Sequence, residues 1–320
     1  MARRLRALLG GAAAVALPAA FNARAARATP RLESRLGGDR SYYPWDQGYL
    51  FFAVEGEGPP LVLVHGVYPG ASSDEWRKVF PSLSGSRRVY ALDLLGFGLS
   101  DRPRITYDPP LYESLLGDFL QDVVGEPATL CASGLAGAFA VHTAFQRPAA
   151  VSGLVLVCPT GVYDASEPPR LTNFLLHRAL RLPVLGLSAY LALTSRAGLE
   201  RWLGERVYHD GGALAASLDG HHVVARQMGA SYAIAAYLSG ILDEPVDGIF
   251  GDLQPPVLLA WGRHSRLARV DSAGGFATLN PRAELEIFER SGALPQVEEA
   301  ERFGEVVTAW LARAAARAPG

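Results

Sequence analysis

The chain has 320 residues, of which 49% are hydrophobic and 19% charged, and its formal net charge is −2. This length fits one large domain, or a domain with an insert, and the apolar fraction is sufficient for a full core. Arginine is spread along the chain and Lys78 is the only lysine. The near-neutral balance without a basic cluster argues against a nucleic-acid partner.

The first 35 residues differ in composition from the rest. Residues 1–6 are basic, residues 7–21 are apolar apart from one proline, and Ala-x-Ala patterns follow. This order is typical of a secretory signal, and the apolar stretch is short for a membrane-spanning helix. The second hypothesis is that this segment is a retained membrane anchor. An organellar transit peptide is the third, although no serine precedes Ser34. We therefore expect an extracytoplasmic protein, or one held at a membrane by its N-terminus, with the folded domain at residues 36–320.

Strand and helix patterns alternate along most of that domain. Residues 43–56 have the alternation of an antiparallel strand pair, and parallel βα units begin near residue 59. The alternation stops between about residues 160 and 252, where helical runs follow one another. The pattern predicts an α/β fold with a mostly parallel sheet and a helical cap inserted at about residues 160–252. The cap is expected over the carboxyl ends of the strands, where open α/β sheets bind ligands.

Two cysteines, Cys131 and Cys158, fall at the ends of strands that we expect to be neighbours in the sheet. Adjacent parallel strands rarely present the geometry that a disulfide needs. We therefore predict a pair of buried free thiols.

A short apolar strand, a tight turn and a helix rich in small residues follow one another in the middle of the chain. Their order is that of the Gly-x-Ser-x-Gly nucleophile elbow, which needs small residues two before and two after the nucleophile. Only Ala132 and Ala136 satisfy this spacing, and they place Gly134 in the nucleophile position. With Ser133 as nucleophile, Leu135 would occupy a small position, and leucine is too large. The side chain of Ser133 is expected to point away from the pocket.

Five segments in the same order resemble those of α/β-hydrolases that carry a helical cap, over roughly residues 45–315. One strand ends in His65, Gly66 and Val67, where that superfamily supplies an oxyanion-hole N–H. Residues 93–103 match the superfamily segment Asp-x-x-Gly-x-Gly-x-Ser-Asp-x-Pro. The resemblance implies a mostly parallel, eight-stranded α/β-hydrolase sheet with a cap insertion.

The resemblance also implies a catalytic triad in the order nucleophile, acid, histidine. Gly134 stands at the nucleophile position, Ser265 at the acid position after a Trp-Gly strand end, and Ala293 at the histidine position. No histidine follows His264, so no shift of register restores a C-terminal catalytic histidine. A serine hydroxyl needs a neighbouring imidazole, itself oriented by a third group, to act as a nucleophile. The sequence therefore predicts a degenerate triad and no serine-hydrolase catalysis.

The backbone oxyanion hole is expected to persist, formed by the N–H groups of Val67 and Leu135. Loss of the triad side chains predicts an apolar cavity at the pocket floor. The cap residues expected to close over it are Phe174, Leu175 and Leu176. Trp76 resembles the family's aromatic residue at the start of a helix behind the oxyanion loop, and such a residue is more often part of the core than a ligand contact. The oxyanion loop and pocket are assigned to His65, Gly66, Val67, Ser133, Leu135 and Trp76.

The remaining histidines suggest no metal site, and no cofactor is predicted. His142 is expected to pack or hydrogen-bond within the helix layer. His221 and His222 are adjacent on a cap helix and face different ways, which favours a solvated surface over metal ligation. His264 is expected near the pocket rim.

Two classes of function remain. The first is a non-catalytic α/β-hydrolase-fold protein that binds an apolar small molecule or a protein partner. The second is an active hydrolase or non-hydrolytic enzyme acting on an ester-like or lipophilic small molecule, for instance through Ser133 as a displaced nucleophile. The substitutions at the triad positions favour the first class, although a fold by itself does not decide function.

Overall fold

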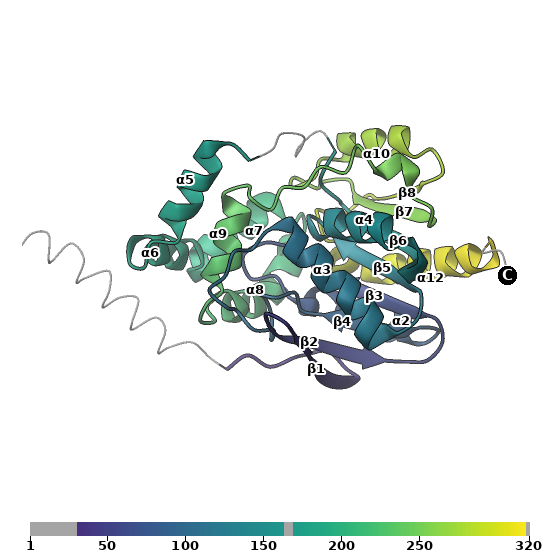
Figure 1. The fold of residues 1–320 in the computed structure, drawn as a ribbon, viewed down its shortest axis with the longest axis horizontal. Coiled ribbons are helices and arrows are strands. Elements are labelled where there is room, and N and C mark those ends of the chain that lie inside the picture. The colour runs from purple at the N-terminus through teal and green to yellow at the C-terminus, as the bar shows by residue number, and fades with distance from the viewer. Residues whose placement is uncertain (1–30, 163–168, 318–320) are drawn as a thin grey trace, which may run out of the picture.

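The computed structural model describes residues 31–162 and 169–317 (Figure 1). The predicted signal or anchor segment, residues 1–35, lies almost wholly outside this part of the chain. Among the described residues, no helix is both long and apolar enough to cross a membrane.

Eight strands form one sheet in the order β1-β2-β4-β3-β5-β6-β7-β8. Strands β1 and β2 are antiparallel to their neighbours, and all other pairs are parallel, which confirms the predicted fold class. The strands are β1 Asp39–Trp45, β2 Gly48–Glu55, β3 Pro60–Val64, β4 Arg88–Leu92, β5 Ala128–Ser133, β6 Val151–Val157, β7 Val257–Gly262 and β8 Glu284–Phe288.

Helices cover both faces of the sheet, and further helices lie between β6 and β7. The layer helices are α2 Phe80–Ser84, α3 Pro109–Phe119, α4 Ala136–Gln146, α10 Ala273–Leu279, α11 Pro295–Glu298 and α12 Ala300–Arg317. The helices between β6 and β7, which we call the cap, are α5 Leu171–Leu180, α6 Leu185–Leu193, α7 Arg196–Arg206, α8 Gly211–Ala225 and α9 Ser231–Leu238. Short turns of helix are η1 Ser73–Trp76, η2 Leu120–Val124, η3 Pro148–Ala150, η4 Phe250–Asp252 and η5 Val270–Ser272.

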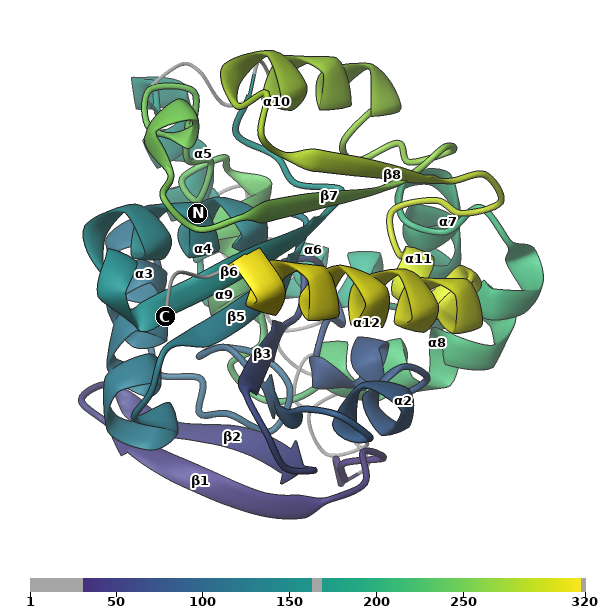
Figure 2. The ribbon, with the colours of Figure 1, turned by 90° about the vertical axis from the view of Figure 1, so that its right-hand side faces the viewer.

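The central strands are buried on both faces, as expected for a parallel sheet between two helix layers. In β3, Val62 and Val64 pack with α3 and α4, whereas Leu61 and Leu63 pack with α2 and α12. Figure 2 shows α12 lying across the sheet on the face opposite α3 and α4. The alternation of side chains along a strand therefore divides the core into two apolar layers.

Cys131 lies in β5 and Cys158 directly follows β6, and these two strands pair in register. Both thiols are buried and free, as the sequence predicted.

The loop after β4 is held by one buried carboxylate. The side chain of Asp93 accepts hydrogen bonds from the N–H groups of Ser73 at 2.7 Å and Leu99 at 2.7 Å. Gly98 has φ of +49°, and a methyl group there would lie 2.0 Å from this carboxylate. The Gly-x-Gly spacing of the loop thus allows the backbone to close around Asp93.

We predict that Asp93→Ala lowers the free energy of unfolding by about 2–4 kcal/mol, because it leaves two backbone N–H groups without an acceptor. Denaturant unfolding monitored by circular dichroism measures this change. Asp39→Ala, on the exposed edge strand β1, is the matched control and should change it by less than about 0.5 kcal/mol. Equal effects of the two substitutions would contradict the role assigned to Asp93.

Candidate functional site

The turn between β5 and α4 has a left-handed backbone at Gly134. Its φ is +58°, and its N–H donates to the carbonyl of Val157 at the end of β6, at 2.8 Å. A Cβ placed on Gly134 would meet no atom within 4 Å. The turn therefore has the strained backbone of a nucleophile elbow and open space where a side chain would project, but no side chain.

A cavity of about 180 Å³ lies at this turn, where the loops after β3, β5, β6, β7 and β8 meet the cap. It is lined by Gly66, Val67, Tyr68, Ser133, Gly134, Leu135, Cys158, Thr160, Tyr237, Asp243, Leu267, Ala293 and Leu294.

Two of the three positions predicted for the triad line the cavity, and the third lies behind it. Gly134 and Ala293 line the same cavity, with Ala293 in the loop between β8 and α11, where its N–H donates to Val207 at 2.7 Å. Ser265 follows β7, is buried, and contacts the thiol of Cys158. Ser265 does not line the cavity, whereas Cys158, which it contacts, does.

Cys158 is the one non-glycine residue of the described chain with a positive φ, +43°. The N–H of Gly262 donates to its sulfur at 3.3 Å. Burial raises the pKa of the Cys158 thiol to about 12. Because the thiolate is the nucleophilic form, Cys158 is not an activated nucleophile in this setting.

Two backbone N–H groups are available at the cavity. Within the described residues, neither Val67 nor Leu135 donates its N–H to a hydrogen bond, and both residues line the cavity. They are the groups that the sequence assigned to an oxyanion hole. They offer two donors to an electronegative atom of a ligand.

His65 and Trp76, which were grouped with the pocket, lie outside its lining. One ring nitrogen of His65 lies 2.7 Å from the carbonyl of Gly66, and the other accepts the N–H of Leu94 at 3.1 Å. Burial lowers the pKa of His65, so the ring is neutral and fixes two loops. Trp76 is fully buried beside Phe303 of α12, with ring centroids 6.2 Å apart, in the apolar layer of that sheet face.

A buried carboxylate behind the oxyanion loop was not found from the sequence. Glu75 accepts hydrogen bonds from the N–H of Gly66 at 3.2 Å, the hydroxyl of Tyr68 at 2.9 Å and the amide of Gln296 at 3.1 Å. The same amide lies 3.4 Å from the hydroxyl oxygen of Ser133. Burial raises the pKa of Glu75 to about 7, although these hydrogen bonds oppose the shift.

Ser133 lines the cavity, but its hydroxyl lies against Gln296, which is outside the cavity lining. This agrees with the expectation that the Ser133 side chain points away from the pocket. No sequence pattern marks Glu75 beyond its position directly before Trp76 in η1. Its role depends on contact with Gln296, 221 positions away.

The cap contributes residues to the cavity other than those predicted. Phe174, Leu175 and Leu176 are 50%, 59% and 46% exposed on α5 and do not reach it. Tyr237, from α9, and Asp243, which follows α9, line it instead. Burial raises the pKa of Asp243. The predicted closure by the α5 residues is therefore wrong.

One expectation for the cap histidines is also wrong. His221 is buried, not solvated: its ring nitrogens lie 2.7 Å from the hydroxyl of Tyr208 and 2.9 Å from the carbonyl of Gly70. It thereby links cap helix α8 to the loop after β3. His264 stacks on His209, with ring centroids 3.8 Å apart, and is not among the residues that line the cavity.

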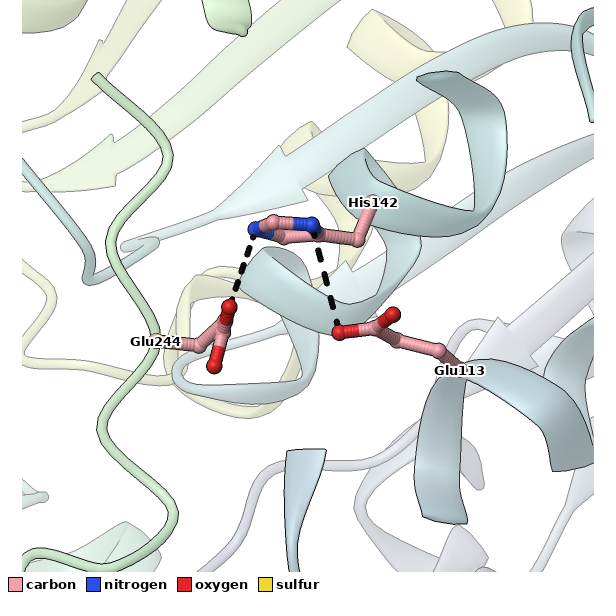
Figure 3. A group of neighbouring side chains, drawn as sticks. All are labelled: Glu113, His142 and Glu244. Atoms are coloured by element: carbon pink, nitrogen blue, oxygen red, sulfur yellow. Dashed lines mark ion pairs between the residues drawn. The ribbon is translucent and has the colours of Figure 1, made fainter. Parts of the chain in front are cut away.

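His142 on α4 lies between two carboxylates (Figure 3). One ring nitrogen is 3.9 Å from Glu113 on α3, and the other is 3.3 Å from Glu244, which follows the cap helices. The donor atoms of the three residues lie within 4.8 Å of one another, close enough for a metal ion to be considered. A metal ion would take one ring nitrogen, whereas here the two nitrogens face different carboxylates. The Nε2 atom also lies 3.0 Å from the carbonyl of Pro245, and we interpret the group as a polar bridge between the cap and the helix layer.

A parallel sheet with this turn and two backbone donors at its carboxyl edge defines an α/β-hydrolase architecture. The family model for the α/β hydrolase fold matches residues 59–300. The chain therefore belongs to the α/β hydrolase fold family, which confirms the resemblance.

Known hydrolases are among its relatives. The 2-hydroxymuconate semialdehyde hydrolase of Pseudomonas sp. (strain CF600) is 28% identical over 273 residues, covering 82% of this chain and 90% of that enzyme. The crystal structure of a serine hydrolase involved in carbazole degradation has a TM-score of 0.72 at 20% identity, over 86% of this chain and 99% of its own. A membrane phospholipase A has a TM-score of 0.70 at 25% identity, over 98% and 99%.

Glu75 makes stability depend on pH in a direction that can be tested. Its pKa is raised above that of an unfolded glutamate, so between about pH 4.5 and 7 the folded state binds the extra proton. The contribution of Glu75 to the free energy of unfolding is therefore greatest below about pH 4.5 and is lost as the pH rises through about 7.

We predict that wild type loses on the order of 3 kcal/mol more stability than Glu75→Gln between pH 4.5 and pH 8, because each pKa unit corresponds to about 1.4 kcal/mol. Urea unfolding of both proteins across this range measures the difference. All other groups titrate equally in wild type and in Glu75→Gln. Identical dependence of the free energy of unfolding on pH would therefore show that the pKa of Glu75 is not raised.

Proposed function

We propose that this protein is an α/β-hydrolase-fold protein without serine-hydrolase catalysis, and that it binds an apolar small molecule in the cavity at the end of β5. The observation that carries the proposal is Gly134 at the apex of the elbow, where the backbone is left-handed and the space for a nucleophile is open. Ala293, on the same cavity, offers a methyl group where the family's histidine is expected.

The cavity walls support a ligand with an apolar body and one polar group. Leu135, Leu267 and Leu294 supply apolar surface. The hydroxyl of Thr160 is buried without a hydrogen-bond partner among the described residues, and such a group gains from a ligand that supplies one. An apolar cavity of about 150 Å³ is large enough for benzene. A single ring or a short acyl chain therefore matches the volume of this cavity.

A specific observation also favours a second candidate, an active enzyme that uses Ser133. Its hydroxyl shares a buried cluster with Glu75, and burial raises the pKa of that carboxyl to about 7, the range of a general base at neutral pH. The relatives named as hydrolases add support to this alternative. Against it, Ser133 is the last residue of β5 and does not occupy the elbow apex.

For the N-terminal segment we propose export from the cytoplasm or attachment to a membrane. The basic start, the apolar stretch and the Ala-x-Ala patterns support this placement. The likeness to a membrane phospholipase A, which spans 98% of this chain, is consistent with it. The alternative to a bound small molecule is a bound protein partner.

We predict that the purified protein does not turn over short or medium p-nitrophenyl esters above an unfolded control, and is not labelled by a fluorophosphonate probe. The reason is the absence of an imidazole to activate a serine at the cavity. Gel fluorescence and a spectrophotometric assay measure the two outcomes. Stoichiometric labelling that is lost in Ser133→Ala and kept in Ser100→Ala would contradict the proposal and establish the second candidate.

Restoring the triad tests whether the cavity is a hydrolase site that lacks only its catalytic side chains. The triple variant Gly134→Ser, Ser265→Asp, Ala293→His should raise esterase turnover by about 10²-fold or more, since positioned acid–base catalysis alone contributes about 10²–10⁴-fold. The double variant without Ala293→His is the matched control and should stay inactive. If the folded triple variant stays inactive as well, these three positions do not form a triad geometry and the site assignment is wrong.

A further inference from the structure

Helix α5 contacts α6 and α9, but most of its side chains are exposed. Of its ten residues, only His177 is buried. The side chains of Leu171, Phe174 and Leu175 are 74%, 50% and 59% exposed. Large apolar side chains exposed on a short helix indicate an interaction surface, because isolated helices of this length are only marginally stable in water.

The exposed apolar surface continues from α5 to the start of α6. Six of the eleven exposed large hydrophobic side chains of the described residues fall within 15 positions of one another, from 171 to 185. They are Leu171, Phe174, Leu175, Leu176, Leu182 and Leu185, which we call the cap face. Figure 1 shows α5 and α6 projecting from the body of the molecule at the end opposite α12.

Arginines predominate in the sequence of the cap face, although Asp164 and Glu167 precede it and Arg196 pairs with Asp219 of α8. Residues 170–199 contain four arginines and no aspartate or glutamate. Arg178 is exposed in the last turn of α5, and Arg181 packs over the ring of Tyr232 with its guanidinium 5.6 Å from the centroid. A projecting helix with apolar side chains and cationic neighbours has the composition of elements that lie in the interface of an anionic bilayer.

The described chain begins on the same side of the molecule. Residues from Leu32 to Arg35 share a groove with Ser217, Gly220 and His221 of cap helix α8, and Arg35 pairs with Asp74. Figure 1 shows this purple segment leaving the sheet beneath α8, toward the side of α5 and α6. The predicted signal or anchor segment directly precedes it. A chain attached through that segment would be held with its cap near the bilayer.

We propose that the cap face docks on an anionic lipid surface, with its apolar side chains in the interfacial region and the arginines against the headgroups. The cap residues of this contact are separate from those of the cavity, so the proposal does not depend on the ligand or on catalysis.

The test uses the full chain with one cysteine added, Leu175→Cys, labelled with an environment-sensitive nitrobenzoxadiazole dye. Cys131 and Cys158 are both buried and stay unlabelled in the folded protein. Leu285→Cys, a 42% exposed position on β8, is the matched control. Each labelled protein is mixed with vesicles of phosphatidylcholine alone, or of equal parts phosphatidylcholine and phosphatidylglycerol.

With phosphatidylglycerol present, the label at position 175 should shift to shorter wavelength and be quenched by chain-labelled nitroxide lipid, while the label at 285 should do neither. Adding Arg178→Gln should lower the ratio of inserted to exposed label by roughly fivefold, as expected for one cation at an anionic surface.

Four results would overturn the proposal. The first is a label at 175 that behaves like the one at 285 with both kinds of vesicle. The second is an equal response to both kinds, which removes the anionic preference. The third is a spectral shift of the label at 175 that occurs without vesicles and grows with protein concentration, which would show that the cap face binds a second copy of the chain. The fourth is a shift without vesicles at every concentration, which assigns it to another segment of the same chain.

Discussion

The left-handed backbone at Gly134 is the constraint on which the site depends. It lets β5 end and α4 begin within two residues, and the Gly134 N–H bonded to Val157 fixes the turn to the end of β6. In this family of folds the same turn presents a nucleophile. Here it presents a glycine, for which a positive φ has little cost. A positive φ is strained for other residues, and our proposal is that the protein keeps this turn without a nucleophile.

Polar groups are concentrated behind the cavity rather than on its floor. Glu75 joins the oxyanion loop, through Gly66 and Tyr68, to Gln296 at the start of α11. The carboxylate of Glu298 accepts the N–H groups of His209 and Gly292, which ties the cap to the loop before Ala293. The hydrogen bonds of Glu75 are buried, so breaking one would leave an unpaired polar group in the interior, whereas those of Glu298 are exposed or partly buried. The loops on the core side of the cavity are therefore tied to one another by hydrogen bonds.

Much of the fold could be predicted because its signals are local. Apolar strands such as β3 and the small residues around Gly134 are visible in short windows of sequence. The network at Glu75 could not be predicted, since Glu75 and Gln296 meet only through the packing of η1 against α11. The cap was predicted in outline but not in detail: α5 is apolar in sequence, which suggested cavity lining for Phe174, and the structure leaves that residue exposed. Composition indicates that a helix is apolar, but not which surface it meets.

The most direct test of the central claim is a comparison of the small molecules that co-purify with two folded variants from the native host. Gly134→Leu fills the cavity floor, whereas Gly125→Leu places the same side chain at another positive-φ glycine with open space, outside the cavity lining. Mass spectrometry of the denatured proteins should find one apolar compound, near one equivalent, with wild type and Gly125→Leu, and little of it with Gly134→Leu. The same compound in equal amount with all three proteins, or none with any, would contradict a binding cavity at the vacated elbow.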